Sequence, residues 1–331
     1  MKTLRWGIVG TGSIANSMAG MIRMADAAST GAVSSRHMET AEEFAKDHDV
    51  PNAFDSWQEM FDSDAVDAIY VATPTSVREE ICIAAARAGK HVLGEKPFAS
   101  LPSVQRIVQA CRDNDVAFMD GTHFVHHPRT LDIRQHREER LGFVWSVASA
   151  FQFMLEDRGN IRFNPELEPM GAIGDAGWYN MRAAVEYLPP EVVLDTVSAH
   201  LRRDSETGAA ISGTGVLEFT DGSTSTWNCG FDSGGVVMDL RITGTKGVIN
   251  IDDFLGQNQD GSADFLYRKG GWSDATSEEI TIPSAKPGAA LMFEDMAAAA
   301  QDPSLRNQWM TATERTQALL DAAWTAALQS E

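Results

Sequence analysis

Residues 4–15 read Leu-Arg-Trp-Gly-Ile-Val-Gly-Thr-Gly-Ser-Ile-Ala, and this stretch decides the fold of the first part of the chain. An apolar run with strand character ends in a glycine turn, and a helix-like segment follows. Glycines let the backbone turn tightly and let a phosphate approach it, while the N–H groups of the following helix face that phosphate. The pattern predicts a dinucleotide-binding loop rather than a merely structural turn, formed by Gly10, Thr11, Gly12, Ser13 and Ile14.

The first 120 residues continue to alternate between strand and helix. Strands separated by helices of about 10–14 residues are typical of a parallel, doubly wound sheet. After residue 120 the sequence pattern changes to alternating, β-rich segments with short turns, which are typical of an antiparallel sheet. We therefore predict an α/β protein with a Rossmann domain over residues 1–122 and an α+β domain over residues 123–331. The second domain should carry an open, mainly antiparallel sheet, with strands near 144–153, 192–201, 215–220, 223–231, 236–243 and 247–251 and helices near 175–188, 291–301 and 312–328.

Composition limits the classes of function. The 331 residues carry a formal net charge of −20, which repels phosphate backbones and argues against nucleic-acid binding. The acidity otherwise indicates a solvated surface or a salt-adapted source. No apolar run approaches the roughly 20 residues of a membrane span. Three cysteines without close spacing indicate reduced thiols in a cytoplasmic protein, and no metal site is expected because no cysteine or third histidine shows ligand spacing.

The end of the second predicted strand indicates which dinucleotide is bound. An NAD-selective site needs an acidic residue about 20 residues after the glycine loop, where it holds the ribose diol. Here residues 34–38 contain no carboxylate. Ser35 and Arg36 can instead hold a 2′-phosphate, so we predict NADP as the cofactor. The alternative is that Arg36 is an ordinary surface arginine.

Lys96 follows the fourth strand of the predicted parallel sheet, within Glu95-Lys96-Pro97. Ligands of such sheets bind beyond the carboxyl ends of the strands. An ammonium group placed there can polarise a carbonyl or assist proton loss from a hydroxyl. Glu95 would then pair locally. The alternative is a surface glutamate–lysine pair.

Asp175 and Tyr179 form a second candidate group. Their i, i+4 spacing at the start of a predicted helix places them on one face. A tyrosine can exchange a proton if a nearby cation favours its ionised form. Taken alone, Asp175 fits a helix cap equally well, and Tyr179 fits a half-buried core residue.

Together these motifs resemble the Gfo/Idh/MocA oxidoreductase family. The resemblance is carried in order by Gly10-Thr11-Gly12, Thr73-Pro74, residues 88–92, Glu95-Lys96-Pro97 and Asp175-x-Gly-x-Tyr179. It implies a Rossmann domain followed by an open sheet that commonly forms the oligomer interface. It also implies that Lys96, Asp175 and Tyr179 form the catalytic cluster over the nicotinamide, that Thr73, Pro74, Thr75, Glu95 and Lys96 contact the cofactor, and that the Lys96–Pro97 bond is cis.

Departures from the family pattern refine the expectation. Tyr179 stands where the helix usually carries histidine, which resembles the glucose–fructose oxidoreductase and dihydrodiol/D-xylose dehydrogenase branch, whose members favour NADP. Thr75 and Arg78 replace the family's asparagine and histidine, which leaves the cofactor contacts made there open. His126 and the polar-loop residue Arg162 are candidate substrate contacts beside Lys96, Asp175 and Tyr179. His127 is a further candidate, and interdomain packing with hydrogen bonding is the alternative for both histidines.

The sequence therefore predicts an NADP-dependent enzyme that transfers a hydride between the nicotinamide and a sugar, polyol or related cyclic alcohol or carbonyl. The expected partner is this small molecule, and we expect a homo-oligomer formed through the C-terminal sheet. One alternative is trans-dihydrodiol dehydrogenase activity. Others are an oxidoreductase that recycles a tightly held NADP and a sensor that binds NADP without turnover.

Overall fold

The computed structural model describes residues 3–331, which form two compact units. The first unit contains the described residues up to His126 together with residues 286–314, and the second contains residues 127–285 and 315–331. The sequence predicted a single domain boundary after residue 122 and a second domain that continued to the C-terminus. The structure instead returns residues 286–314 to the first unit, where Phe293 packs edge-on against the ring of Trp6 at a centroid distance of 4.8 Å.

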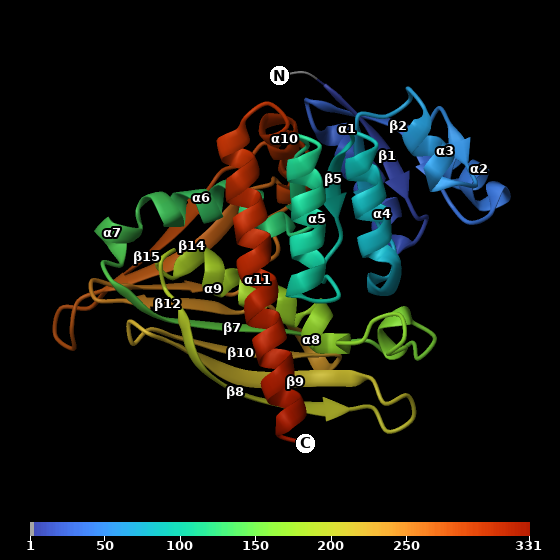
Figure 1. Cartoon of the computed structure of the whole chain (residues 1–331). Helices are drawn as coiled ribbons and strands as arrows, with labels where there is room; N and C mark the ends of the chain where they lie inside the picture. The colour runs from blue at the N-terminus through green and yellow to red at the C-terminus, as the bar shows by residue number, and fades with distance from the viewer. Residues whose placement is uncertain (1–2) are drawn as a thin grey trace. The chain divides into compact units, whose positions relative to one another are not determined.

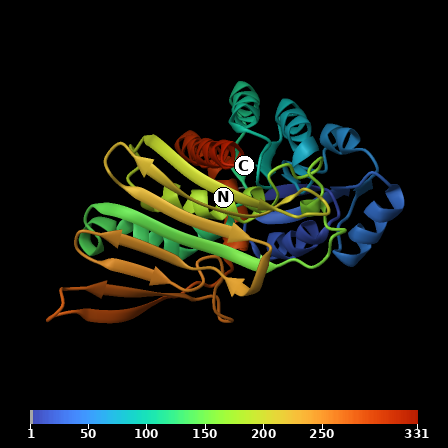
Figure 2. The same cartoon turned by 90° about the horizontal axis from the view of Figure 1, so that it is seen from below.

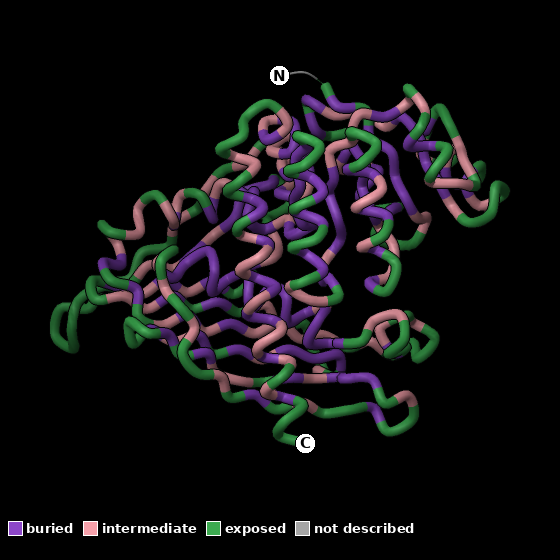
Figure 3. Tube along the Cα trace, viewed as in Figure 1, coloured by how far each residue is buried: buried purple, intermediate pink, exposed green. Residues whose placement is uncertain are grey.

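Within the described part of the first unit, six parallel strands form one sheet in the order β3-β2-β1-β4-β5-β6. The central strands are buried along most of their length (Figure 3). The strand order reverses between β1 and β4, which is the point where open α/β sheets form a ligand crevice. The strands are β1 (Leu4–Val9), β2 (Ala28–Ser34), β3 (Ala53–Phe54), β4 (Ala68–Val71), β5 (His91–Gly94) and β6 (Phe118–Asp120).

Helices connect these strands, and α4 and α5 lie side by side against the sheet (Figure 1). Serine hydroxyls cap two of them: Ser56 precedes α3, and Ser100 precedes α5, which also carries a proline in its first turn. The helices of this unit are α1 (Ser13–Met24), α2 (Met38–Asp47), α3 (Trp57–Asp62), α4 (Thr75–Arg87), α5 (Leu101–Asp113), the 3₁₀ turn η1 (His123–His126), α10 (Gly288–Ala299) and the first part of α11 (Pro303–Gln329).

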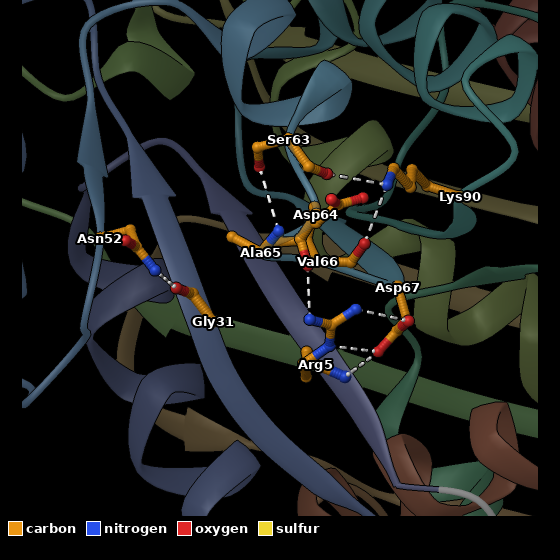
Figure 4. Close-up of polar contacts among 9 residues, drawn as sticks. All are labelled: Arg5, Gly31, Asn52, Ser63, Asp64, Ala65, Val66, Asp67 and Lys90. Atoms are coloured by element: carbon orange, nitrogen blue, oxygen red, sulfur yellow. Dashed lines mark hydrogen bonds and ion pairs between the residues drawn. The ribbon is translucent and has the colours of Figure 1, made fainter.

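Polar contacts close the amino end of the parallel sheet (Figure 4). Arg5 donates to both oxygens of Asp67, with Nε–Oδ2 at 2.8 Å and Nη2–Oδ1 at 3.0 Å. The Lys90 ammonium donates to the Val66 carbonyl at 2.9 Å and the Ser63 carbonyl at 3.2 Å. These contacts join the start of β1 to the segments before β4 and β5, so Arg5 and Lys90 stabilise the fold at this end of the sheet.

In residues 127–285, nine strands form a mainly antiparallel sheet with the order β15-β14-β13-β12-β7-β10-β9-β8, and β11 pairs with β7. Only the β7–β10 pair is parallel. Figure 2 shows these strands lying side by side, with a broad face of the sheet toward the viewer. The strands are β7 (Val144–Met154), β8 (Leu194–Arg203), β9 (Ala210–Phe219), β10 (Thr224–Gly230), β11 (Asp232–Val237), β12 (Leu240–Gly244), β13 (Val248–Ile251), β14 (Ala263–Lys269) and β15 (Thr276–Ile282).

One face of this sheet is packed against helix α9, and the core between them contains fully buried Trp178 and nearly fully buried Trp227. The sequence predicted one helix from Asp175 to Leu188. The structure begins it earlier and divides it at Ala176, whose backbone stays helical. The other helices here are α6 (Pro128–Gln135), α7 (Arg137–Arg140), the 3₁₀ turn η2 (Ile161–Phe163), α8 (Gly171–Asp175), α9 (Gly177–Tyr187) and the end of α11.

Candidate active site

The strand register of the first unit brings the ends of four neighbouring strands to one edge of the sheet. Val71, the last residue of β4, lies opposite Val9 of β1 and Gly94 of β5. Gly94 in turn lies opposite Asp120 of β6. The glycine loop, the Thr73–Thr75 segment and the Lys96 segment each follow one of these strands. They therefore share the carboxyl edge, where ligands of such sheets bind.

The glycine loop has the backbone geometry that a pyrophosphate requires. Gly10 adopts a φ of 103°, and a Cβ atom added there would lie 2.7 Å from the Ala72 carbonyl oxygen. Gly12 precedes α1 without a side-chain cap, and no atom lies within 4 Å of the position of an added Cβ. The first N–H groups of α1 are thus left for an anion, so the loop fits the phosphates of a dinucleotide.

Asn16 fixes the shape of this loop, a role that the sequence interpretation missed. Its amide nitrogen donates to the carbonyls of Thr11 at 3.1 Å and Gly12 at 3.0 Å. Its amide oxygen lies 2.7 Å from Nε2 of His48. The available signal was an asparagine four residues after Gly12, where a side chain can return to the loop carbonyls.

Ser35 and Arg36 follow β2 next to the glycine loop, because the Gly10 N–H donates to the Ser34 carbonyl at 2.9 Å. Ser35 is half-buried and Arg36 is exposed. An exposed guanidinium at this position fits the 2′-phosphate of a dinucleotide.

Glu95 and Lys96 leave β5 through a tightly held backbone, and the Lys96–Pro97 bond is cis, as the family resemblance implied. The Tyr70 hydroxyl donates to Oε1 of Glu95 at 2.6 Å, and the Lys96 N–H donates to Oε2 at 3.2 Å. Tyr70 is fully buried and Glu95 is nearly so. A Cβ added to Gly121 would lie 2.7 Å from Oε1. The carboxylate therefore holds the segment that presents Lys96, and its predicted cofactor contact stays a prediction.

Arg78, whose role the sequence left open, joins two of the segments at the carboxyl edge. The buried guanidinium donates to the carbonyls of Thr73 and Pro97, and to the Thr75 hydroxyl at 3.0 Å. The Thr75 hydroxyl in turn donates to the Pro97 carbonyl at 3.3 Å. The residue that replaces the family's histidine thus connects the start of α4 to the Lys96–Pro97 peptide.

Three histidines after β6 have separate surroundings. His126 is enclosed in the first unit, with Nδ1 2.6 Å from Asp295, and its predicted substrate contact stays a prediction. His127 caps α6 by accepting from the Arg129 N–H at 3.0 Å. Burial, followed by the charges of Lys96 and His126, lowers the pKa of His123 to about 4. His123 is therefore neutral at pH 7 and within electrostatic reach of Lys96, a relationship that sequence reasoning missed.

In the second unit, Arg162, Asp175 and Tyr179 come together around the start of α9. Arg162 Nη2 donates to Asp175 Oδ1 at 3.0 Å, and Nε lies 2.8 Å from Oδ2. The carboxylate of Asp175 raises the pKa of Arg162, and Tyr179 acts in the same direction. Tyr179 is buried, and its ring meets Phe151 edge-on with centroids 5.5 Å apart. This group can hold or move a proton at the phenol.

The predicted site residues thus form two sets, each well defined within its own unit. Lys96 and the cofactor residues belong to the first unit, and Arg162, Asp175 and Tyr179 belong to the second. Their meeting over a nicotinamide stays a prediction.

Three further features concern metal ligands, cysteines and apolar helices. Within residues 3–331, no cluster of three or more His, Cys, Asp or Glu side chains could hold a metal ion. The cysteines are free and buried, as expected, and burial raises the pKa of Cys82 and Cys229 to about 12. No helix in this range combines the length and the apolar character that a bilayer crossing requires.

Comparisons with known proteins match both parts of the chain. Residues 4–122 match a family model described as oxidoreductase family, NAD-binding Rossmann fold, and residues 134–250 match the GFO/IDH/MocA C-terminal domain. The chain is 28% identical over 270 residues to D-xylose 1-dehydrogenase (NADP(+)) 2 of Haloferax volcanii, a match that covers 81% of this chain and 82% of the relative. It is 28% identical over 254 residues to trans-1,2-dihydrobenzene-1,2-diol dehydrogenase of Bos taurus, which covers 76% and 74%.

A solved structure extends the likeness to nearly the whole chain. The 3-ketoreductase from Actinomadura kijaniata, solved with NADP and TDP-benzene, aligns with a TM-score of 0.87 at 23% identity and covers 98% of both chains. The two proteins therefore share a fold.

Proposed function

The chain belongs to the Gfo/Idh/MocA oxidoreductase family, and we propose that it is an NADP-dependent dehydrogenase or reductase of a sugar, a polyol or a related cyclic alcohol or carbonyl. One observation carries the proposal. The register of β1, β4 and β5 places the glycine loop and the Lys96 segment at the same edge of the parallel sheet. A nucleotide on the loop and a substrate held by Lys96 then share one crevice.

The cofactor is held by residues of the first unit. The glycine loop receives the pyrophosphate at the start of α1, and Ser35 with Arg36 receives the 2′-phosphate. The segment after β4 and the Lys96 segment contact the nicotinamide end. The proposed set is Gly10, Thr11, Gly12, Ser13, Ile14, Ser35, Arg36, Thr73, Pro74, Thr75, Glu95 and Lys96.

Proton transfer is the task of Lys96, Tyr179 and Asp175. Bound NADP supplies the hydride acceptor or donor. The Lys96 ammonium orients the substrate oxygen and stabilises the negative charge that develops on it. The Tyr179 phenol exchanges the hydroxyl proton, and Asp175 fixes a substrate hydroxyl or the lysine. His126 and Arg162 complete the proposed substrate contacts.

Two relatives indicate the range of substrates. The Haloferax volcanii relative is a D-xylose dehydrogenase, which favours a sugar, and the Bos taurus relative keeps an aromatic trans-diol as the second candidate. A sensor that binds NADP without turnover is the alternative from another class. The presence of Lys96, Asp175 and Tyr179 argues against a sensor.

We also propose a homo-oligomer formed through the sheet of the second unit, in the cytoplasm. Trp227 and Cys229 of β10 are buried, and Cys229 is packed near Gly177 of α9. Side chains alternate along a strand, so the exposed Thr226 belongs to the opposite face, where strands β7 to β10, β12 and β13 line a hollow of about 620 Å³. Light scattering on the purified chain tests this proposal, and Thr226→Arg should shift the mass toward the monomer.

A substrate panel with NADP tests the enzymatic proposal. Aldoses, inositols and cyclic trans-diols are offered with NADP, and the matching carbonyls with NADPH. Turnover should fall at least about 100-fold in Lys96→Met, because the group that stabilises the oxygen is lost, while the NADP Kd stays within threefold.

The matched control is Lys46→Met, since Lys46 is an exposed lysine on α2 of the same unit. It should keep full turnover. NADP binding by the parent protein with no turnover on any panel member supports the sensor instead, and full activity of Lys96→Met refutes the role of Lys96.

A further inference from the structure

Arg162 is held by two side chains, Asp175 and Asn160, before any substrate arrives. One hydrogen bond, from Nη2 to Asp175 Oδ1, and one ion-pair contact, from Nε to Oδ2 without the alignment of a hydrogen bond, join the guanidinium to the carboxylate. The Asn160 side-chain oxygen accepts from the Arg162 backbone N–H at 3.1 Å and from Nη1 at 3.4 Å. The arginine side chain is about one third exposed, whereas Asp175 is 13% exposed. Both terminal nitrogens of Arg162 therefore already contact the protein.

The position of Asp175 allows its ion pair with Arg162 to influence the ionisation of Tyr179. Asp175 and Tyr179 are four positions apart along α8 and α9, with a helical residue between the two helices, so their side chains share a face about 6 Å apart at Cβ. An uncompensated carboxylate at that distance would oppose the formation of a phenolate. A guanidinium in the same cluster favours it, and Tyr179 does act electrostatically on Arg162.

We propose that Arg162 is a positioning residue: it fixes the orientation of Asp175 and cancels its charge, which leaves Tyr179 able to exchange a proton with the substrate. This inference rests on the proposed role of Tyr179 and adds a source of positive charge within the second unit. It replaces direct substrate contact as the main task of Arg162.

Other titratable groups around the cluster in the second unit are compatible with this role. Glu168 also acts on the charge of Arg162. The Cys229 thiol of β10 is buried, and its pKa is raised to about 12, so it stays neutral. The ring of Phe151 on β7 is apolar. The charge of Lys96 belongs to the first unit and is varied separately by Lys96→Met.

The first test is a spectroscopic titration that needs no substrate. The ultraviolet absorbance of ionised tyrosine is followed against pH, and the contribution of Tyr179 is obtained by subtracting the Tyr179→Phe variant. In Arg162→Gln, the midpoint of the Tyr179 titration should rise by roughly one pH unit, since a cation is lost and a carboxylate is uncovered. In Arg162→Gln with Asp175→Asn, at least half of that rise should disappear. Arg162→Lys should lie between the parent and Arg162→Gln.

Arg158→Gln is the matched control. Arg158 belongs to the same loop and forms its own ion pair, with Nη2 3.1 Å from Asp204. Its loss should leave the Tyr179 midpoint unchanged. The inference is overturned if the Tyr179 midpoint is unchanged in Arg162→Gln, or if the double variant is shifted as far as the single one. It is also overturned if Tyr179 does not ionise below the pH of unfolding in either protein.

The second test separates positioning from substrate contact. With a substrate from the panel, Arg162→Gln should lower kcat for dehydrogenation about tenfold at pH 7 and move the alkaline rise of kcat by the same pH interval as the titration, with KM changed less than threefold. A raised KM with an unchanged pH profile makes Arg162 a substrate contact and refutes the inference. A parent protein without turnover contradicts the proposed function alone, because the titration still reports the charge relation.

Discussion

Replacing Tyr70 by phenylalanine removes one hydroxyl from the interior of the first unit and tests how the Lys96 segment is held. The hydroxyl donates to Glu95 at 2.6 Å, and neither residue is exposed. The ring would keep its packing against Phe293, whose centroid lies 6.0 Å away. The substitution therefore removes a hydrogen bond without opening a cavity.

The expected cost follows from the charge of the acceptor. A hydrogen bond to a charged group contributes about 1.5–3 kcal/mol, and a buried carboxylate oxygen that loses its donor is costly. We expect Tyr70→Phe to lower the free energy of unfolding by about 2 kcal/mol, or about 30-fold in the folding equilibrium. Because the same carboxylate accepts from the Lys96 N–H, kcat should fall about tenfold while the NADP Kd stays nearly unchanged.

Urea unfolding followed by tryptophan fluorescence measures the first quantity, and steady-state kinetics measures the second. Tyr267→Phe is the matched control, since the Tyr267 hydroxyl donates to the neutral Arg140 carbonyl at 3.0 Å in the second unit. It should cost about 1 kcal/mol and leave kcat unchanged. If Tyr70→Phe costs no more than Tyr267→Phe and keeps full kcat, Glu95 does not hold the Lys96 segment as described.

Further substitutions test the cofactor loop, its selectivity and the pH dependence of stability. Gly10→Ala would place a Cβ 2.7 Å from a carbonyl oxygen at a φ of 103°, so it should weaken NADP binding at least about tenfold. Gly20→Ala has open space inside α1 and should instead raise the free energy of unfolding by about 0.5–1 kcal/mol. Equal NADP affinities of the two variants in a binding titration would contradict this account of the loop. Arg36→Ala should raise the KM for NADP about 10- to 100-fold and change the KM for NAD little. Arg112→Ala, at another exposed arginine, should leave the ratio of the two KM values unchanged. An unchanged ratio in Arg36→Ala would refute the selectivity argument. The pKa of His123 is about 4 in the folded protein and about 6.5 when unfolded, so the unfolded chain binds more protons between these values and stability falls as the pH drops from about 6.5 to 4. His123→Gln should reduce that fall by about 2–3 kcal/mol in urea unfolding at the two pH values, and an identical pH dependence would show that His123 is not buried as a neutral group.

The first unit could be predicted closely because its signals are local. The apolar run that was expected to form a strand is β1 (Leu4–Val9), and the helix expected after the glycine turn is α1, which begins at Ser13. The predicted fold class and family are both confirmed. In the second unit β14 and β15 were missed; Thr276–Ile282 of β15 is mostly exposed, contains two adjacent glutamates and does not alternate clearly. The helix turn before Asp175 was missed because glycines at 171 and 174 weaken helix propensity, and packing on the sheet overrides that preference.

The candidate site could be predicted by residue type but not by pairing. Sequence identified Arg162 and Asp175 as polar residues of one region, yet nothing in their spacing indicated an ion pair between them. His126 was expected near substrate, and its partner Asp295 lies 169 positions later in the chain. The hydrogen bond from Tyr70 to Glu95 was not predicted, since a sequence does not show where a buried hydroxyl finds its acceptor. Contacts between distant segments are set by tertiary packing, which local patterns do not record.

The path of α11 governs when the nucleotide-binding half can be completed. This single helix begins in the first unit and passes into the second after Glu314, and α10 supplies the Phe293 ring that covers Trp6. A ribosome that has released residues 1–126 has therefore delivered the whole parallel sheet without its last packing layer. The nascent sheet must wait for about 190 further residues, roughly ten to forty seconds of synthesis, before that surface is sealed. A protein fragment that ends at residue 126 would expose this aromatic surface permanently, so we expect it to aggregate.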